Sequence, residues 1–352
     1  ATVSARGDVW TLPREHGSPR NLSRSVGSAE RYPTWSPDGK HIAYFSDASG
    51  EYELYVTQAD GRGETRKLTS GEKTFYFNLY WSPTSEKIAF TDKAGRLFVY
   101  DTESEKVEQL DEDPWASRPS VSWSIDGRYL AYDRNLDSGV TAIFLHDFDS
   151  GERQQLTSGM FSDSDPTFDR EGKYLVFSSG RHFSPLYSGV DTSFIYAGTE
   201  KLMLVPLEDE KTPFAPEYDA ETWEEDEEGE EEGEKDEDDQ GEKDEDDQGE
   251  EEKDEEGKKE KGKKKDEPPK VEVVVDGFEL RAVEIPVDPG VFGTLAFNDK
   301  GHLLYGRRPI RGEDGDSKVV ALDLADDDHE EKTVVDGTAA FDISADGDRK
   351  ST

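Results

Sequence analysis

Cysteine is absent from this sequence of 352 residues, and methionine occurs only twice. Without Cys the chain can form no disulfide, no thiolate nucleophile and no Cys-ligated zinc site. This composition fits the cytoplasm or a Cys-free exported protein. Apolar runs near the ~18 residues of a membrane-spanning helix are also absent. No N-terminal segment has the pattern of a signal peptide.

Basic residues are scarce beside acidic ones: 42 Lys and Arg face 83 Asp and Glu, a net charge of −41. A chain this acidic repels phosphate backbones, which argues against nucleic-acid binding. The charge is uneven, because residues 221–267 hold 28 acidic residues and only 9 Lys. This tract has almost no apolar side chains to offset the entropy of ordering. We therefore expect a disordered Glu/Asp/Lys/Gly-rich insert over 216–270.

A repeated motif organises the rest of the chain. Residues 33–39 read Pro-Thr-Trp-Ser-Pro-Asp-Gly, and related segments recur with a unit of about 45 residues. Their anchor residues are Trp35, Trp81, Trp123, Phe168, Phe297 and Ile343. We expect each anchor to end a strand with its side chain in the core. The Ser-Pro-Asp-Gly segment predicts a tight turn in which Pro presets φ and Gly takes a positive φ.

Each unit contains four short strands with period-two alternation and no long amphipathic helix, which predicts an all-β chain folded as a β-propeller. Five full units and two partial ones predict six or seven blades, incomplete at both ends. In the first partial unit, Asp8–Leu12 and Arg20–Ser23 are expected as third and fourth strands, and the first two strands are expected to be missing. We expect blades over 1–215 and 271–352, with a last blade cut short by truncation.

No catalytic motif emerges from the residues. The six His form no metal-type pair, and there is no HExxH, GxSxG or P-loop pattern. We therefore predict no catalytic residue, no metal site and no cofactor. One aromatic stretch of mixed polarity, residues 181–196, lies between the second and third strands of its unit. Its residues Arg181, His182, Tyr187 and Asp191 are predicted to line an axial channel or its rim; the alternative is packing on a neighbouring domain.

The repeats resemble the TolB/PD40 type of WD40-like propeller, marked by the Trp-Ser-Pro-Asp-Gly turn. Longer strings resemble tricorn-type peptidases of the S41 serine peptidase family, and they match the second, seven-bladed propeller of those proteins. These strings are Ala5–Pro13, Arg20–Ser23, Glu30–Gly39, Ser46–Tyr55, Asp163–Phe168, Arg181–Ser188, Ser193–Tyr196 and Val275–Val283. The resemblance covers nearly the whole chain apart from the acidic insert.

This resemblance implies a parent protein that is a serine-type peptidase, with a PDZ domain and a catalytic domain after the propeller. It also implies hexamers and a propeller that admits and filters oligopeptides. The family's catalytic residues lie in those later parts, so none is carried over to this chain. Two alternatives remain open: a non-enzymatic TolB-like protein-binding propeller, and the propeller of a prolyl-oligopeptidase-type hydrolase. We expect a cytoplasmic protein, with a periplasmic or exported one as the alternative.

Overall fold

The structure is a computed structural model of the whole chain. It describes residues 1–13, 16–71, 73–189, 191, 193–208, 212–214, 268–310, 314–326, 328–348 and 350–351. Residues 1–214 and 268–352 form one compact unit, described below. The acidic tract predicted to be disordered lies almost entirely in 215–267, outside the described residues. No helix among the described residues is long and apolar enough to cross a membrane.

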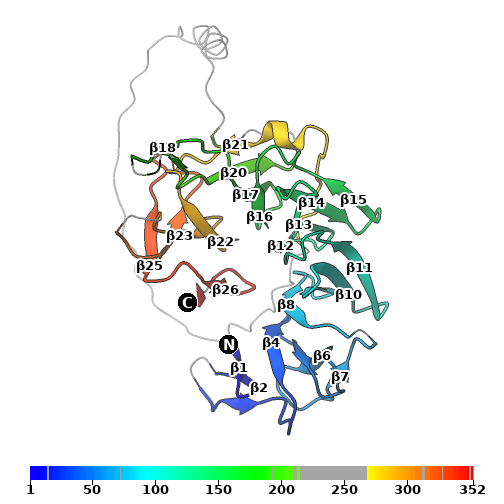
Figure 1. Cartoon of the computed structure of the whole chain (residues 1–352). Helices are drawn as coiled ribbons and strands as arrows, with labels where there is room; N and C mark the ends of the chain where they lie inside the picture. The colour runs from blue at the N-terminus through cyan, green and yellow to red at the C-terminus, as the bar shows by residue number, and fades with distance from the viewer. Residues whose placement is uncertain are drawn as a thin grey trace, which may run out of the picture. The chain divides into compact units, whose positions relative to one another are not determined.

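The described residues form five four-stranded antiparallel sheets, and within each sheet the strands follow one another in chain order (Figure 1). The predicted β-propeller of four-stranded units is thereby confirmed. The sheets consist of β4 (Glu30–Trp35), β5 (His41–Ser46), β6 (Glu53–Gln58) and β7 (Arg66–Lys67); β8 (Tyr76–Trp81), β9 (Lys87–Asp92), β10 (Arg96–Asp101) and β11 (Lys106–Glu112); β12 (Val121–Trp123), β13 (Tyr129–Asn135), β14 (Thr141–Asp147) and β15 (Glu152–Gln155); β16 (Asp163–Phe168), β17 (Tyr174–Ser179), β20 (Lys201–Pro206) and β21 (Val283–Glu284); and β22 (Val291–Phe297), β23 (Leu303–Arg308), β24 (Lys318–Leu322) and β25 (Lys332–Asp336).

Smaller sheets complete the unit. A three-stranded sheet holds β1 (Thr2–Ala5), β2 (Asp8–Thr11) and β3 (Arg20–Asn21), and a two-stranded sheet holds β26 (Asp342–Ile343) and β27 (Lys350–Ser351). The strands predicted at 8–12 and 20–23 are thus present. The prediction that no strand of the first unit precedes them is wrong, because β1 pairs with β2 along four residues.

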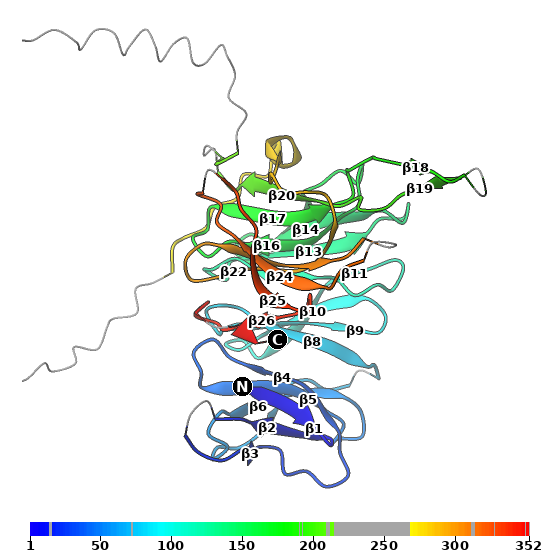
Figure 2. The same cartoon turned by 90° about the vertical axis from the view of Figure 1, so that its left-hand side faces the viewer.

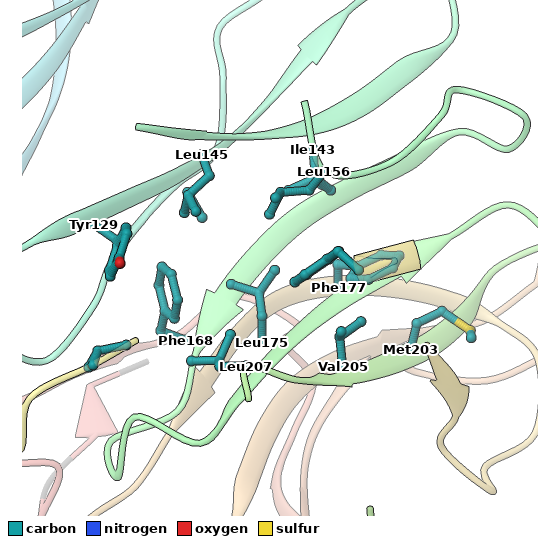
Figure 3. Close-up of a cluster of buried hydrophobic side chains, with 13 residues drawn as sticks. Tyr129, Ile143, Leu145, Leu156, Phe168, Leu175, Phe177, Met203, Val205 and Leu207 are labelled. Carbon is teal, nitrogen blue, oxygen red and sulfur yellow. The ribbon is translucent and has the colours of Figure 1, made fainter. Parts of the chain in front are cut away.

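The apolar core lies between successive sheets rather than at one centre. One cluster brings Tyr129, Ile143 and Leu145 of the β12–β15 sheet against Leu175 and Phe177 of the next sheet (Figure 3). Similar clusters join each sheet to its neighbour along the chain. The middle strands are therefore covered on both faces, and almost every residue of β5, β9, β13 and β17 is buried. Continuous apolar strands are what two-faced burial requires.

The anchor residues both fill this core and connect the sheets. Trp123 and Phe168 are buried, whereas Trp35 and Trp81 are half-buried. The indole N–H of Trp81 donates to the carbonyl oxygen of Thr34 at 3.3 Å, and that of Trp123 donates to the carbonyl of Tyr80 at 3.0 Å. Each of these Trp residues thus binds the first strand of the preceding sheet.

The turn after each anchor has the predicted chemistry. In the first copy the hydroxyl of Ser36 accepts the backbone N–H of His41 at 2.9 Å, and Asp38 accepts the N–H of Lys40 at 3.0 Å. Gly39 has φ +72°, and the Gly residues of the other copies also have positive φ. Ser85 replaces Gly in the second copy and still adopts φ +64°, so the turn geometry does not depend on Gly alone.

After the acidic tract the chain rejoins the same sheet from which it departed. Val271 and Phe278 are fully buried in the cluster of Figure 3, and a 3₁₀ helix, η1 (Phe278–Arg281), precedes β21. The backbone N–H of Val271 donates to Asp126 at 2.9 Å, which ties this segment to the preceding sheet. The tract therefore interrupts one blade between its third and fourth strands.

The repeated turn can be tested at Gly39. An added Cβ there meets no atom within 4 Å, so only the backbone conformation opposes a side chain. We expect Gly39→Ala to lower the free energy of unfolding by about 1–2 kcal/mol, the cost of a left-handed conformation with a Cβ. Gly39→Asn, which tolerates that conformation, should lose clearly less. Denaturant titration measures both, and equal losses for Ala and Asn would contradict the assignment.

Candidate functional site

A cavity of about 300 Å³ lies where the first strands of successive sheets come together. Figure 1 shows β4, β8, β12, β16 and β22 on the inner sides of their sheets. The cavity is lined by Tyr80, Trp81, Pro83, Val121, Ser122, Trp123, Ile125, Thr167, Phe168, Asp169, Arg170, Leu295, Ala296, Phe297 and Ile343. We call it the axial cavity. Its walls come from four of the five complete sheets and from β26, and they are largely aromatic and aliphatic.

The first strands share a backbone irregularity near the end at which they start. In β4, β8, β16 and β22 the pairing with the second strand shifts register within the five residues before the anchor. Three of the residues at these bulges, Tyr32, Asn78 and Asp165, have φ between +49° and +56°. Each lies three residues before its anchor, the repeat position that Ser120 also occupies. A bulge re-aims side chains; at this repeat position Tyr32 packs against Phe45 and Phe77 between two sheets, whereas Ser120 and Asp165 make polar contacts between the next two.

Asp133 and Asp165 form an acidic cluster between the β12–β15 sheet and the next sheet. Asp133, at the end of β13, accepts the backbone N–H of Ser120 at 2.8 Å and that of Asp165 at 2.9 Å. The hydroxyl of Ser120 in turn donates to Asp165 at 2.7 Å. Asp133 is only 8% exposed. Burial raises the pKa of Asp133 to about 7, and the nearby charge of Asp165 adds to the increase.

Two further groups extend the acidic cluster. The hydroxyl of Tyr80 interacts with Asn78, and burial raises the pKa of Tyr80, with smaller contributions from the charges of Asp133 and Asp165. Glu200, which accepts the backbone N–H of Phe292 at 2.7 Å, has a pKa raised by burial and by Asp165. The end of the axis at which the first strands begin therefore carries the carboxyl groups of Asp133, Asp165 and Glu200, with Arg118 and Arg308 nearby, whereas the axial cavity beyond it is largely apolar. We call this end of the axis the acidic end for its carboxyl groups.

The sequence-predicted residues lie on a hairpin beside this acidic end. Arg181 donates to Ser179 at 2.7 Å and to the buried Asp163 at 3.3 Å, and its guanidinium lies over Phe161 at 4.9 Å. The backbone N–H of His182 donates to Thr199 at 3.0 Å. Arg181 and His182 thus fix the base of the hairpin.

The other two predicted residues lie farther out on the same hairpin. Tyr187 is 64% exposed, and Asp191 is exposed and accepts the backbone N–H and the hydroxyl of Ser193. Hydrogen bonds from Ser188 and Ser193 hold the pKa of Asp191 below its ordinary value, so it carries a negative charge. None of the four predicted residues lines the axial cavity, and their role at a rim stays a prediction.

Sequence reasoning missed Asp133 and Asp165. The signal for Asp165 was present, because it occupies the repeat position three residues before an anchor. Asp133 gave no comparable signal, since Asp follows strands in many turns of this chain. Among the described residues, no group of three or more His, Asp or Glu side chains has the arrangement to hold a metal ion.

These sheets, with first strands around a common cavity, define the class of β-propellers. The chain belongs to the family described as the tricorn protease second beta propeller domain, whose sequence profile matches residues 1–349. A crystal structure of the tricorn protease superposes with a TM-score of 0.69 at 16% identity, covering 98% of this chain and 30% of that chain.

Curated relatives match part of the chain. Tricorn protease homolog 1 of Streptomyces coelicolor is 26% identical over 223 residues, which cover 61% of this chain and 21% of that protein. The uncharacterized peptidase YuxL of Bacillus subtilis is 34% identical over 170 residues, which cover 48% of this chain and 23% of that protein. The chain thus spans less than a quarter of the length of these two relatives.

The acidic cluster predicts a specific pH dependence. The pKa of Asp133 is about 7 in the folded protein and near 3.8 when unfolded, so both states hold the proton only below about pH 3. As the pH rises from 4 to 7, the carboxyl group of Asp133 ionises first in the unfolded state. The free energy of unfolding therefore falls by up to about 4 kcal/mol. Asp133→Asn removes that loss, so the variant should gain on the wild type over this interval.

Denaturant titrations at several pH values measure this difference. Any constant cost of Asp133→Asn from altered hydrogen bonds cancels, because only the change with pH is compared. The control is Asp137→Asn, which removes an exposed carboxylate from the following loop. Comparing the two pH profiles separates the effect of the buried carboxyl group from that of losing an acidic side chain. A stability difference for Asp133→Asn that does not change with pH would show that Asp133 ionises normally in the folded protein.

Proposed function

We propose that this chain is the propeller of a tricorn-like serine peptidase and that it admits and filters oligopeptides toward a catalytic domain. The observation that carries the proposal is the axial cavity, whose walls are first strands of successive sheets. In this proposal a catalytic domain elsewhere in a longer protein cleaves the peptides. The family resemblance also implies a PDZ domain in that protein and a hexameric assembly.

The chemistry of the axis fits a polypeptide passenger. Ligand sites are typically apolar clefts of about 300–1,000 Å³ with a few polar groups that fix orientation. Here Trp81, Phe168 and Phe297 offer apolar surface to side chains, and Asp165 and Glu200 offer acceptors to N–H and ammonium groups. A cavity of this size takes an extended segment and excludes a folded domain, which is the property that a filter needs.

The four hairpin residues are part of this proposal. Arg181 and His182 hold the hairpin base, and Tyr187 and Asp191 reach outward from it. The hairpin begins after β17, at the same end of its sheet where β16 starts with Asp163 and Asp165. An oligopeptide that approaches the acidic end of the axis would therefore meet the hairpin first.

Blocking the axial cavity tests the proposal. Thr167 is half-buried and lines the cavity, so Thr167→Trp places an indole in the passage. We expect this variant to bind labelled, unstructured oligopeptides at least about tenfold more weakly than the wild type, corresponding to about 1.4 kcal/mol. Fluorescence anisotropy with the full chain measures the affinities.

The matched control is Ser150→Trp, which adds the same side chain at an exposed turn of the β12–β15 sheet. We expect its peptide affinity to equal that of the wild type. Circular dichroism and thermal melting establish that both variants fold. Unchanged peptide affinity in folded Thr167→Trp would refute an axial route.

A further inference from the structure

Four aromatic rings form a row on one face of the hairpin made by β18 (Leu186–Tyr187) and β19 (Phe194–Ile195). Tyr187 and Phe194 are cross-strand partners, so their side chains lie on the same face, with ring centroids 6.0 Å apart. Tyr196 follows two residues after Phe194 and lies 6.5 Å from it, and Phe183 lies 5.8 Å from Tyr196. We call Phe183, Tyr187, Phe194 and Tyr196 the aromatic row.

The aromatic row faces water. Phe183 is 76% exposed, Tyr187 64%, Phe194 57% and Tyr196 56%. Single exposed apolar residues are common on protein surfaces, but a contiguous set marks an interaction site. Figure 2 shows the hairpin extending beyond the other strands of its sheet, with β18 and β19 at its outer part. The rings contact one another and gain little from the propeller core.

The hairpin is anchored at its base. Arg181 pairs with Asp163, whose side chain is fully buried, and stacks on Phe161 and Phe177. The two chain segments at the hairpin base are also joined by the hydrogen bond from the backbone N–H of His182 to the carbonyl oxygen of Thr199. The aromatic row is therefore held near the acidic end of the axis, because Asp163 lies two residues before Asp165 in β16.

Charge selects the kind of partner. The chain carries −41, so a nucleic acid is repelled. Asp191, near the hairpin tip, is ionised. Asp165 and Glu200 closely follow Asp163 and Thr199, the residues that hold the hairpin base, and Arg308 lies near Glu200. A partner that covers aromatic rings beside these carboxylates needs both apolar and cationic groups. A row of rings offers surface to extended chains, as aromatic-lined grooves do for proline-rich segments.

We propose that the aromatic row is a docking site for extended polypeptide segments that carry aromatic, proline or aliphatic side chains next to Lys or Arg. This inference rests on the proposed admission of oligopeptides and names the class that is captured first. The rings bind the apolar side chains, and the carboxylates at the tip and at the axis attract the cationic ones. The hairpin then delivers the segment to the acidic end of the axis.

Three labelled peptides of equal length test this proposal on the full chain. One contains Lys with Trp and Pro, the second Glu with Trp and Pro, and the third Lys with Ser and Gly. The variant replaces Phe183, Tyr187, Phe194 and Tyr196 together by Ser; their exposure means that the fold does not need them. We expect the Lys–Trp–Pro peptide to bind the wild type best, with an affinity that falls at high salt. The variant should bind it at least about tenfold more weakly.

The control variant combines Met160→Ser and Leu280→Ser, which remove two other apolar side chains that are 79% and 91% exposed. Its affinity for the Lys–Trp–Pro peptide should match the wild type. An unchanged affinity in the four-Ser variant, with loss in Thr167→Trp, would overturn the docking site and leave axial admission standing. The reverse pattern would support the docking site and refute axial admission.

Two further outcomes would overturn the docking proposal. If the wild type binds none of the three peptides, docking and admission both fail. If sedimentation shows that the wild type self-associates and the four-Ser variant does not, the aromatic row belongs to an interface between copies. Equal binding of the Lys and Glu peptides would contradict the assigned role of the carboxylates.

Discussion

The structure depends on one constraint: each sheet can bury both of its faces only against its neighbours. A single sheet of four short strands has no core of its own, and the apolar clusters all lie between successive sheets. The middle strands must therefore be apolar on both sides, which explains runs such as Ile42–Phe45. The indoles of Trp81 and Trp123 add a polar link to the same contacts, because each donates to the preceding sheet. Stability is thus shared between adjacent units, as in other repeat architectures.

This arrangement leaves the first strands free to carry function. Each first strand pairs with the second strand along one edge, and its other edge lies on the inner side of the sheet (Figure 1). The position three residues before the anchor is Tyr32, Asn78, Ser120 or Asp165 in successive units, although the anchors stay aromatic. The side chain at this position therefore differs from unit to unit, although Tyr32, Asn78 and Asp165 share the same positive φ.

Local chemistry made much of the fold predictable. The turn residues, the anchor and the alternation act within a few positions, so the strands and the turns with positive φ followed from the sequence. The acidic cluster did not, because the contacts of Asp133 with Ser120 and Asp165 cross 13 and 32 residues of chain. The same is true of Arg181, whose charge and aromatic neighbours indicated a rim residue. Its partner Asp163, 18 positions away, shows that it also anchors the hairpin.

The two insertions in one blade leave it at opposite ends, because successive strands are antiparallel. The hairpin made by β18 and β19 connects β17 to β20, and the segment that contains the acidic tract connects β20 to β21. The charge of that tract acts over about one Debye length, ~8 Å at physiological salt, so it raises the local concentration of cations without selecting among them. Discrimination between cationic peptides must come from short-range contacts. In the proposed docking site those contacts are the rings of the aromatic row and the carboxylate of Asp191 near the hairpin tip.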